Sequence, residues 1–485
     1  MGVPSETPSI ATLGRRKEPT LSKLGAFALV LSLTPCVLRG DSVEDAIRAR
    51  IDDASAVTTV VRHLTENIGP RLTGSATLVE AHRFAAARFR AAGLDVTLEP
   101  FRVAHSWERG RAEGELVTPY RHALQLAQMG WTPATGGSVT GPVRFFAPKS
   151  KGEMASFRGR FKDAIVLLGE PATELEPLMM VLPLRIDPKG AVPPHKEAAP
   201  SLEERVGFLR AEGACAFLLD AGKPWGLLDM REYDMASAGE GLPGAFVIHE
   251  QYTLLRRLSE GGATVRLSLE GRMGPAVECL NTVATLRGTT APDEMVLFGA
   301  HLDSWDLGTG ATDNASGSAA VIEAARLLAA TGARPRRSVR FVLFSGEEQG
   351  LLGSIAYVER HRAELARHSA IFIMDTGSGR IDGLSLQGRA EVLPAMQRVV
   401  EPLVSLGVVD TDLRLEWGSD HLPFDKAGVP AFCFEQVQHD YSRNHHSEAD
   451  TFDKIKPAEL QQAAVVAALA LYRIAQLPEL LPRRP

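Results

Sequence analysis

Histidine and carboxylate side chains stand directly after three apolar stretches of the sequence that are typical of buried strands. His301 follows the first stretch and Asp375 follows the third. Glu347 and Glu348 follow the second. Any one of these residues alone would more often be structural, but in open α/β sheets ligands bind at the carboxyl ends of the strands. We therefore expect these side chains to meet at one edge of a sheet.

Two further segments complete the predicted set. A loop of small residues, 310–317, leads into a helix and presents Asp313, and the late segment 444–451 supplies His446. Imidazole and carboxylate groups together suit zinc, with Mn²⁺ or Co²⁺ as substitutes. Five side chains are too many for one tetrahedral zinc that keeps a position for water, but they fit two metals if the small Asp313 carboxylate bridges them. The predicted metal ligands are His301, Asp313, Glu348, Asp375 and His446.

Two metals about 3.5–4 Å apart can bind a shared hydroxide and polarise a scissile carbonyl, which is hydrolytic chemistry. Glu347 is then the expected general base, which takes a proton from the attacking water and passes it to the leaving amine. Asp303 lies two residues after His301 and is expected to accept the other ring N–H of a ligand histidine, which would fix its tautomer.

Helices and strands alternate from Asn281 onward, which predicts an α/β fold. The strand candidates are near-continuous apolar runs, as expected for a sheet covered on both faces. Gly332 closes an Ala- and Leu-rich helix, and Pro457 opens the last helix. The predicted strands are 94–98, 294–300, 339–344, 370–374 and 430–434, and the predicted helices are 81–89, 316–330 and 457–475.

A change in the pattern of predicted helices, strands and loops along the sequence divides the chain into domains. Residues 43–111 are predicted to be the first part of the main domain, and 276–478 its second part, which carries the metal centre. Between them, 112–275 is predicted to be an inserted β-rich module with one or two helices. Short β-rich runs there, at 164–168 and 216–219, alternate with polar and Pro-containing loops.

The composition is that of a globular protein: 485 residues, 45% hydrophobic and 23% charged, which excludes a disordered, collagen-like or coiled-coil chain. Lys and Arg number 53 against 59 Asp and Glu, so the net charge of −6 gives no strong positive field, and nucleic acid is not expected as a partner. Four cysteines do not make a disulfide scaffold. Cys36 is expected to leave with the N-terminus, and Cys215, Cys279 and Cys433 to be small buried hydrophobes with room for one bridge.

The N-terminal residues 1–40 are predicted to be a signal peptide or another export segment. Basic residues at 15–17 and 23 precede a short apolar run from Leu24 to Leu38, which is interrupted by Pro35 and shorter than the roughly 20 residues of a membrane span. We expect an exported protein, periplasmic or secreted, with a lipoprotein or an N-terminal anchor left open. No stable membrane span is expected in the mature chain.

Five separated segments, taken in order, resemble the co-catalytic di-zinc exopeptidases. This family includes secreted bacterial leucyl aminopeptidases, glutamate carboxypeptidases and glutaminyl cyclases. The stretch His301–Asp306 and the pair His445-His446 are most similar to its carboxypeptidase Q (plasma glutamate carboxypeptidase) branch. The segments that carry the resemblance are His301-Leu302-Asp303-Ser304, 310–317, 346–354, Met374-Asp375 and His446-Ser447-x-x-Asp450-Thr451, together with 418–424.

The resemblance implies a three-layer α/β/α zinc-exopeptidase fold (phosphorylase/hydrolase-like) with a mixed central sheet and an inserted β-rich protease-associated (PA) type domain. It implies that His301, Asp313 and Asp375 hold one zinc, and that Asp313, Glu348 and His446 hold the other. It also implies Glu347 as general base and a possible homodimer. Some members use a Tyr just before the final His ligand to stabilise the oxyanion, and here that position is His445, a candidate catalytic residue in the same role.

The function expected from these observations is that of an exported zinc-dependent exopeptidase acting on peptides or dipeptides. Aminopeptidase, dipeptidase and carboxypeptidase Q-like preferences all remain open at this stage. One alternative is a glutaminyl cyclase-like transferase with a single zinc. The other is a non-catalytic, peptidase-like binding ectodomain.

Overall fold

Two eight-stranded sheets organise the described part of the chain. The computed structural model describes residues 40–173, 175, 199–233, 235 and 241–484. The predicted export segment, Cys36 included, lies outside the described residues except for Gly40, the first residue of helix α1 (Gly40–Arg48). Among the described residues, no helix combines the length and apolar character that crossing a bilayer requires.

The first sheet is mixed and contains the predicted strands. Its four central strands, β14, β13, β15 and β18, are parallel, so their carboxyl ends lie at one edge. Antiparallel neighbours flank them, β12 beside β14 and β16 beside β18. The strand order is β1 (Asp95–Val103), β12 (Val277–Leu286), β14 (Arg337–Phe344), β13 (Ala291–His301), β15 (His368–Ile373), β18 (Ala431–Gln436), β16 (Ile381–Ser385) and β17 (Asp410–Asp412).

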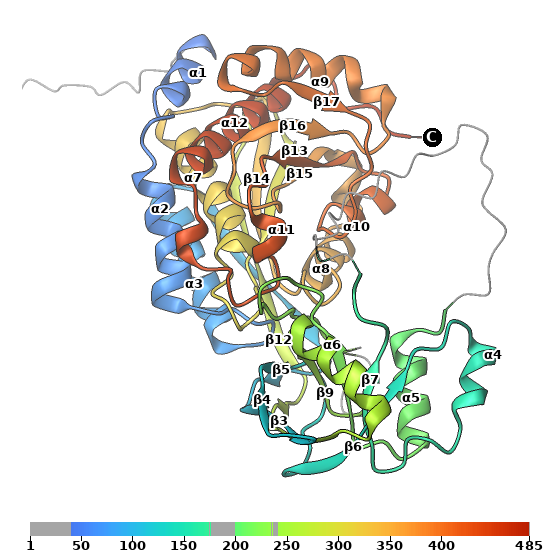
Figure 1. Cartoon of the computed structure of the whole chain (residues 1–485). Helices are drawn as coiled ribbons and strands as arrows, with labels where there is room; N and C mark the ends of the chain where they lie inside the picture. The colour runs from blue at the N-terminus through green and yellow to red at the C-terminus, as the bar shows by residue number, and fades with distance from the viewer. Residues whose placement is uncertain (1–39, 174, 176–198, 234, 236–240, 485) are drawn as a thin grey trace, which may run out of the picture. The chain divides into compact units, whose positions relative to one another are not determined.

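Helices cover both faces of this sheet (Figure 1). On one face, Phe298 and Phe341 belong to a buried cluster with side chains of α2 (Ser55–Arg62), α3 (Ala76–Ala91), α7 (Ser316–Ala330) and α12 (Pro457–Gln476). On the other, Leu297 and Val342 pack with Tyr357 of α8 (Leu352–Arg360) and with α10 (Leu422–Lys426). Because both faces are buried, the strands are apolar throughout rather than alternating. The fold is therefore mixed α/β, as predicted.

The second sheet packs in two further hydrophobic clusters, one of which also contains Leu72, Trp107 and Trp305 from outside residues 112–275. It lies in the region predicted to be a β-rich module, whose exact boundaries stay a prediction. The strand order is β4 (His122–Leu124), β3 (Ala112–Thr118), β10 (Thr264–Leu269), β6 (Val139–Phe146), β7 (Ile165–Leu168), β8 (Ala216–Asp220), β9 (Gly244–Val247) and β5 (Leu126–Gln128), with helices α4 (Lys151–Met154), α5 (Leu202–Ala211) and α6 (His249–Leu258). We call residues 112–275 the insert module below.

Each helix and strand predicted from the sequence is present, with ends shifted by a few residues. Strand β1 extends to Val103, beyond the predicted 94–98, because it pairs with β12 along its whole length. Strands β12, β16 and β17 and helix α9 (Leu393–Val400) were not predicted. Cys279 and Cys433 are buried as predicted, Cys215 is half-buried, and all three are free, so the optional bridge does not form among them.

A buried histidine ties helix α3 to the strands that lead to the predicted site. The Nδ1 atom of His82 lies 2.8 Å from the Thr282 hydroxyl, and its Nε2 lies 2.6 Å from the Ser345 hydroxyl. Since Ser345 donates its own proton to the carbonyl of Leu280, His82 Nε2 is the donor to Ser345. Burial lowers the pKa of His82 to about 3, so the ring is neutral in the folded protein.

We expect His82 to make the folded state sensitive to acid. In the unfolded chain a histidine takes up a proton below about pH 6.5, whereas the folded protein resists protonation until about pH 3. The free energy of unfolding should therefore fall as the pH drops below 6.5, by up to about 1.4 kcal/mol per pH unit from this residue. The variant His82→Gln lacks this dependence, so denaturant unfolding at pH 7.5, 6 and 5 should give it a shallower pH slope than wild type. The exposed His122 provides the control, His122→Gln, and equal slopes for His82→Gln and wild type would contradict the prediction.

Candidate metal centre

Three of the parallel strands deliver the predicted ligands to one edge of the sheet. His301 is the last residue of β13 and pairs in register with Phe344, the last residue of β14. Glu348 follows β14 after a tight turn, and Asp375 follows β15. Loop 310–315 brings Asp313 to the same edge. Helix α11 (Tyr441–Asn444) precedes the histidine pair His445-His446.

The first group of metal-binding side chains is His301, Asp313 and Asp375. His301 Nε2 lies 3.1 Å from Asp313 Oδ1 and 3.0 Å from Asp375 Oδ1, and the ligand atoms of all three residues lie within 4.8 Å of one another. His301 Nδ1 lies 3.0 Å from the main-chain carbonyl oxygen of Asp303, which is an acceptor only, so Nδ1 carries the proton. Nε2 then faces two carboxylate oxygens, an arrangement that is favourable only when a proton or a metal ion lies between the nitrogen and the oxygens.

Electrostatics at His301 indicate the same requirement. Burial lowers the pKa of the imidazole, but the carboxylates of Asp375 and Asp313 outweigh burial and raise the pKa well above its ordinary value. The position is therefore one where positive charge is favoured, whether a proton or a metal ion supplies it.

The second group lies on the other side of the same aspartate. The Oδ2 atom of Asp313 is 3.5 Å from His446 Nε2 and 3.6 Å from His445 Nε2. Glu348 Oε2 is 2.7 Å from His446 Nε2. Asp313 thus turns one oxygen toward each group, which is the arrangement of a bridging carboxylate. Burial raises its pKa, but His301 and the histidine pair outweigh burial and lower it.

The buried carboxylate of Glu348 fits a metal ligand. Its Oε1 atom is buried and has no hydrogen-bond partner among the described residues. Buried polar atoms are normally paired, so an unpaired oxygen on a carboxylate that contacts the His446 imidazole fits a site that a cation completes. Burial, together with the charge of Asp313, raises the pKa of Glu348 well above its ordinary value, which an adjacent divalent ion would reverse.

The structure brings His445 closer to the metal-binding groups than the sequence indicated. His445 Nε2, Asp313 and His446 form a second compact trio of ligand atoms within 4.8 Å of one another. The two imidazole rings stack with centroids 3.6 Å apart. His445, predicted as an oxyanion donor, is therefore as close to Asp313 as the predicted ligand His446 is.

Glu347 and Asp303 occupy the turn that follows β14. The main-chain amides of Glu347 and Glu348 lie 3.4 and 3.3 Å from the carboxylate oxygens of Asp303, so this carboxylate accepts from the turn. The ring N–H of His301 faces the main-chain carbonyl of Asp303, with the carboxylate farther away at 3.7 Å, a difference from the expected contact. Burial, followed by the charges of Asp375 and Asp420, raises the pKa of Glu347 well above its ordinary value, which suits a group that must carry a proton.

Two buried residues that the sequence did not single out hold the loop that carries Asp313. The Arg71 guanidinium is fully buried and donates to the carbonyls of Leu302 (2.7 Å), Thr309 (2.9 Å) and Gly310 (2.8 Å). Burial lowers the pKa of Arg71 to about 10, so it stays charged at neutral pH. Nothing in the local sequence around Arg71 signals this role.

Asp450 supports the same loop through its carboxylate. Its carboxylate accepts from the amide (2.7 Å) and hydroxyl (2.7 Å) of Thr312 and from the amide of Asp313 (3.0 Å). Its place in the motif His446-Ser447-x-x-Asp450-Thr451 was the signal that could have identified it. Ser419, in the 418–424 segment, orients another ligand, because its hydroxyl donates to Asp375 Oδ2 over 2.6 Å.

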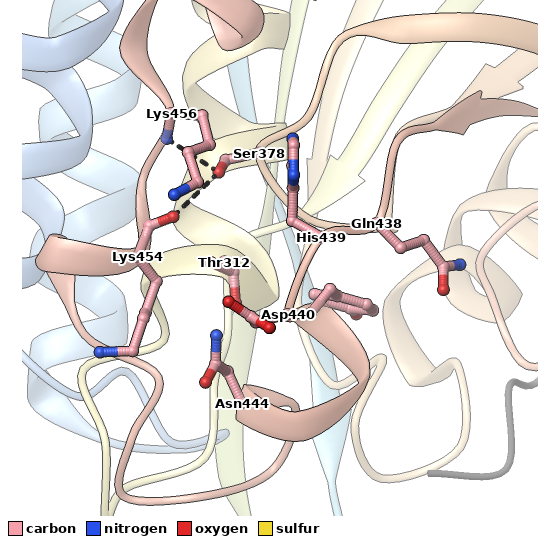
Figure 2. Close-up of a pocket in the computed structure, with 9 residues that line it drawn as sticks. Thr312, Ser378, Gln438, His439, Asp440, Asn444, Lys454 and Lys456 are labelled. Carbon is pink, nitrogen blue, oxygen red and sulfur yellow. Dashed lines mark hydrogen bonds between the residues drawn. The ribbon is translucent and has the colours of Figure 1, made fainter. Parts of the chain in front are cut away.

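A small pocket opens onto the metal-binding groups. Its volume is about 180 Å³, and it is lined by Trp305, Gly308, Gly310, Asp313, Glu348, His446, Ser447 and Asp450. A second pocket, of about 300 Å³, includes Thr312, Ser378, Asp440 and Asn444 (Figure 2). It contains none of the predicted ligands, so the smaller pocket is the one that belongs to the candidate centre.

Comparison with known proteins gives a consistent set of relatives. The model of Peptidase family M28 matches residues 281–471, which include both ligand groups. Carboxypeptidase Q of Mus musculus is 30% identical over 428 residues, which are 87% of this chain and 86% of that protein. Aminopeptidase YwaD of Bacillus subtilis (strain 168) is 25% identical over 470 residues, which are 93% of this chain and 92% of that protein.

Solved structures of similar proteins share the fold. A peptidase M28 precursor from Shewanella amazonensis SB2B has a TM-score of 0.76 at 26% identity, covering 91% of this chain and 98% of that one. A zinc aminopeptidase from Bacillus subtilis has a TM-score of 0.63 at 22% identity, covering 87% and 95%, which supports the fold alone.

The contacts of Asp450 lead to a prediction about metal affinity. Asp450→Asn replaces one acceptor oxygen by an NH₂ group that must face the amide donors of the Asp313 loop. We expect zinc affinity, measured by competition with a chromophoric chelator, to fall about 10- to 100-fold, as for other groups that orient ligands. Asp453→Asn is the matched control, since Asp453 is exposed and, within the described part of the chain, its side chain bonds only to its neighbours Thr451 and Lys454. Equal affinity in Asp450→Asn and wild type would show that the loop holds Asp313 without this carboxylate.

Proposed function

Since the chain belongs to peptidase family M28, we propose that it is a zinc-dependent exopeptidase with two zinc ions in its active centre. The observation that supports a second zinc is the position of Asp313. One of its carboxylate oxygens faces His301, and the other faces the pair His445-His446. A site for one metal has no need of a carboxylate shared between two groups of ligands.

We propose His301, Asp313 and Asp375 as ligands of one zinc, and Asp313, Glu348 and His446 as ligands of the other. The contact of 2.7 Å between Glu348 Oε2 and His446 Nε2 supports the second trio. We keep His445 as the candidate donor to the oxyanion, since its ring stacks on His446 within reach of the same centre.

Two zinc ions held here would activate water for attack and polarise the scissile carbonyl of a peptide. The chain's own residues supply the remaining steps. The Glu347 carboxylate takes the proton of the attacking water and delivers it to the nitrogen of the leaving amine. Asp303 holds the turn on which Glu347 lies, by accepting the amides of Glu347 and Glu348.

The substrate that we propose is a peptide or dipeptide cleaved next to one end. Named relatives include a carboxypeptidase and an aminopeptidase, so the end that is recognised stays open. The single-zinc cyclase-like transferase and the non-catalytic ectodomain are less well supported, because all five ligand positions are filled and grouped around Asp313.

Further parts of the proposal rest on the sequence. We propose that residues 1–40 direct export to the periplasm or the medium, and that the insert module is a PA-type domain. The division into 43–111, 112–275 and 276–478 remains the proposed domain organisation. A homodimer is proposed from the resemblance to the carboxypeptidase Q branch.

The role of Glu347 is tested by Glu347→Gln, which keeps size and hydrogen bonding but removes the proton acceptor. We expect kcat for a dipeptide to fall about 10²- to 10⁴-fold while the zinc content per chain is unchanged. Glu359→Gln, an exposed position on α8 with a side chain 68% accessible, serves as control and should keep wild-type activity. Normal turnover in Glu347→Gln would exclude Glu347 as the base.

The metal count is tested by elemental analysis of the purified protein. We expect two zinc ions per chain, and removal by a chelator should abolish hydrolysis of a panel of dipeptides. Zinc, Mn²⁺ or Co²⁺ added back should restore it. One zinc per chain, together with cyclisation of N-terminal glutamine, would instead support the transferase.

A further inference from the structure

We propose that Lys223, a residue of the insert module, positions the pair His445-His446, so that the insert module forms part of the second zinc site. This inference rests on the two-zinc centre proposed above. It concerns the segment 223–230, which follows β8 of the second sheet and contacts the chain just after α11.

The backbone at His446 needs outside support. His446 has a φ of +54°, in the left-handed region that residues other than glycine adopt only when their surroundings hold them there. Helix α11 ends at Asn444, and the next residue, His445, already leaves the helical conformation with φ −46° and ψ 129°. The direction of both imidazoles depends on this short irregular stretch.

The insert module supplies hydrogen bonds to this stretch. The Lys223 ammonium donates to the carbonyl oxygen of His445 over 2.8 Å, and the Met230 amide donates to the carbonyl oxygen of His446 over 2.9 Å. A third donor, the Leu228 amide, lies 3.0 Å from the carboxylate of Glu448. Both carbonyls of the histidine pair are thus held from the insert module.

Contacts within the histidine segment itself do not replace these bonds. The His445 amide donates to Tyr441, and the Ser447 amide donates to Asn444. These bonds continue the last turn of α11 and engage main-chain amides. They leave the carbonyl oxygens of His445 and His446, which accept from the insert module, without a local partner among these bonds. The donors from 223–230 therefore act on the part of the backbone that the local turn leaves undetermined.

The segment 223–230 is itself anchored by other contacts, so it can restrain the backbone of His445 and His446. Arg109 forms a two-point ion pair with Asp306 (2.7 and 2.8 Å) and contacts the Met230 sulfur at 3.3 Å. Met230 is 1% exposed. The ring of Trp305, packed in the core cluster of the insert module, meets the His446 ring edge-on at 6.0 Å.

Among the donors from 223–230, Lys223 is the one that donates through its side chain, so a mutation can remove this donor without changing a proposed zinc ligand. It is 12% exposed, and Asp229 lies 3.8 Å from its ammonium, which keeps the charged end beside His445. A charge-assisted hydrogen bond to a carbonyl is stronger than a neutral one. Lys223→Met keeps most of the buried stem and loses the donor, whereas Lys223→Arg keeps a donor.

The test titrates zinc and Co²⁺ into metal-free wild type, Lys223→Met and Lys223→Arg. We expect Lys223→Met to bind the first metal equivalent as wild type does and the second about 10- to 100-fold more weakly. The visible absorption bands of Co²⁺ should show a changed spectrum for the second equivalent only. In the fully loaded enzyme, kcat should fall more than KM changes, and Lys223→Arg should recover part of both losses.

Lys149→Met, an exposed lysine of the insert module, is the matched control and should titrate as wild type. Thermal unfolding of the metal-free proteins separates a folding defect from the proposed role, because Lys223→Met should unfold close to wild type without metal. Two equivalents bound by Lys223→Met with wild-type affinity and spectrum would overturn the inference and leave the peptidase proposal standing. A wild-type protein that binds one metal, or that cleaves no peptide, would instead count against the proposed function.

Discussion

The concentration of negative charge around Asp313 is the constraint on which the rest of the structure depends. Its two oxygens face two groups of imidazoles and carboxylates in a buried region, and acidic side chains this close repel one another unless cations lie between them. Other interactions in the fold must therefore hold these groups in place against their mutual repulsion. Arg71 and Asp450 do this through hydrogen bonds to the backbone of the loop, Arg71 to its carbonyls and Asp450 to its amides.

The sheet explains why residues distant in sequence meet. Parallel strands β13, β14 and β15 end at the same edge, so a ligand placed after each one needs no long loop to reach the others. Burial on both faces fixes the strands, and His82 ties helix α3 to the end of β14. The precision of the centre comes from the rigid sheet, and the loops add Asp313 and the histidine pair.

Much of this arrangement could be predicted from sequence because the signals are local. An apolar run followed by His301 or by Glu347-Glu348 identifies both a buried strand and its functional end. Strands β12, β16 and β17 gave no such signal, since polar residues interrupt β12, and β16 and β17 are short strands at one side of the sheet. Arg71 and Lys223 were missed for a different reason. Their partners are backbone carbonyls, at Gly310 and His445, more than two hundred residues away, and no spacing in the sequence encodes such a contact.

Trp305 packs in the core of the second sheet and also touches His446, although it lies only four residues after the end of β13. Its indole therefore contacts both the core beneath the second sheet and the candidate metal centre. A chimera that exchanged the insert module for that of a relative would have to exchange the surroundings of Trp305 as well, or it would disturb the packing against the His446 ring. The same coupling should leave a trace in evolution, as correlated replacement of Trp305 and the side chains that pack against it.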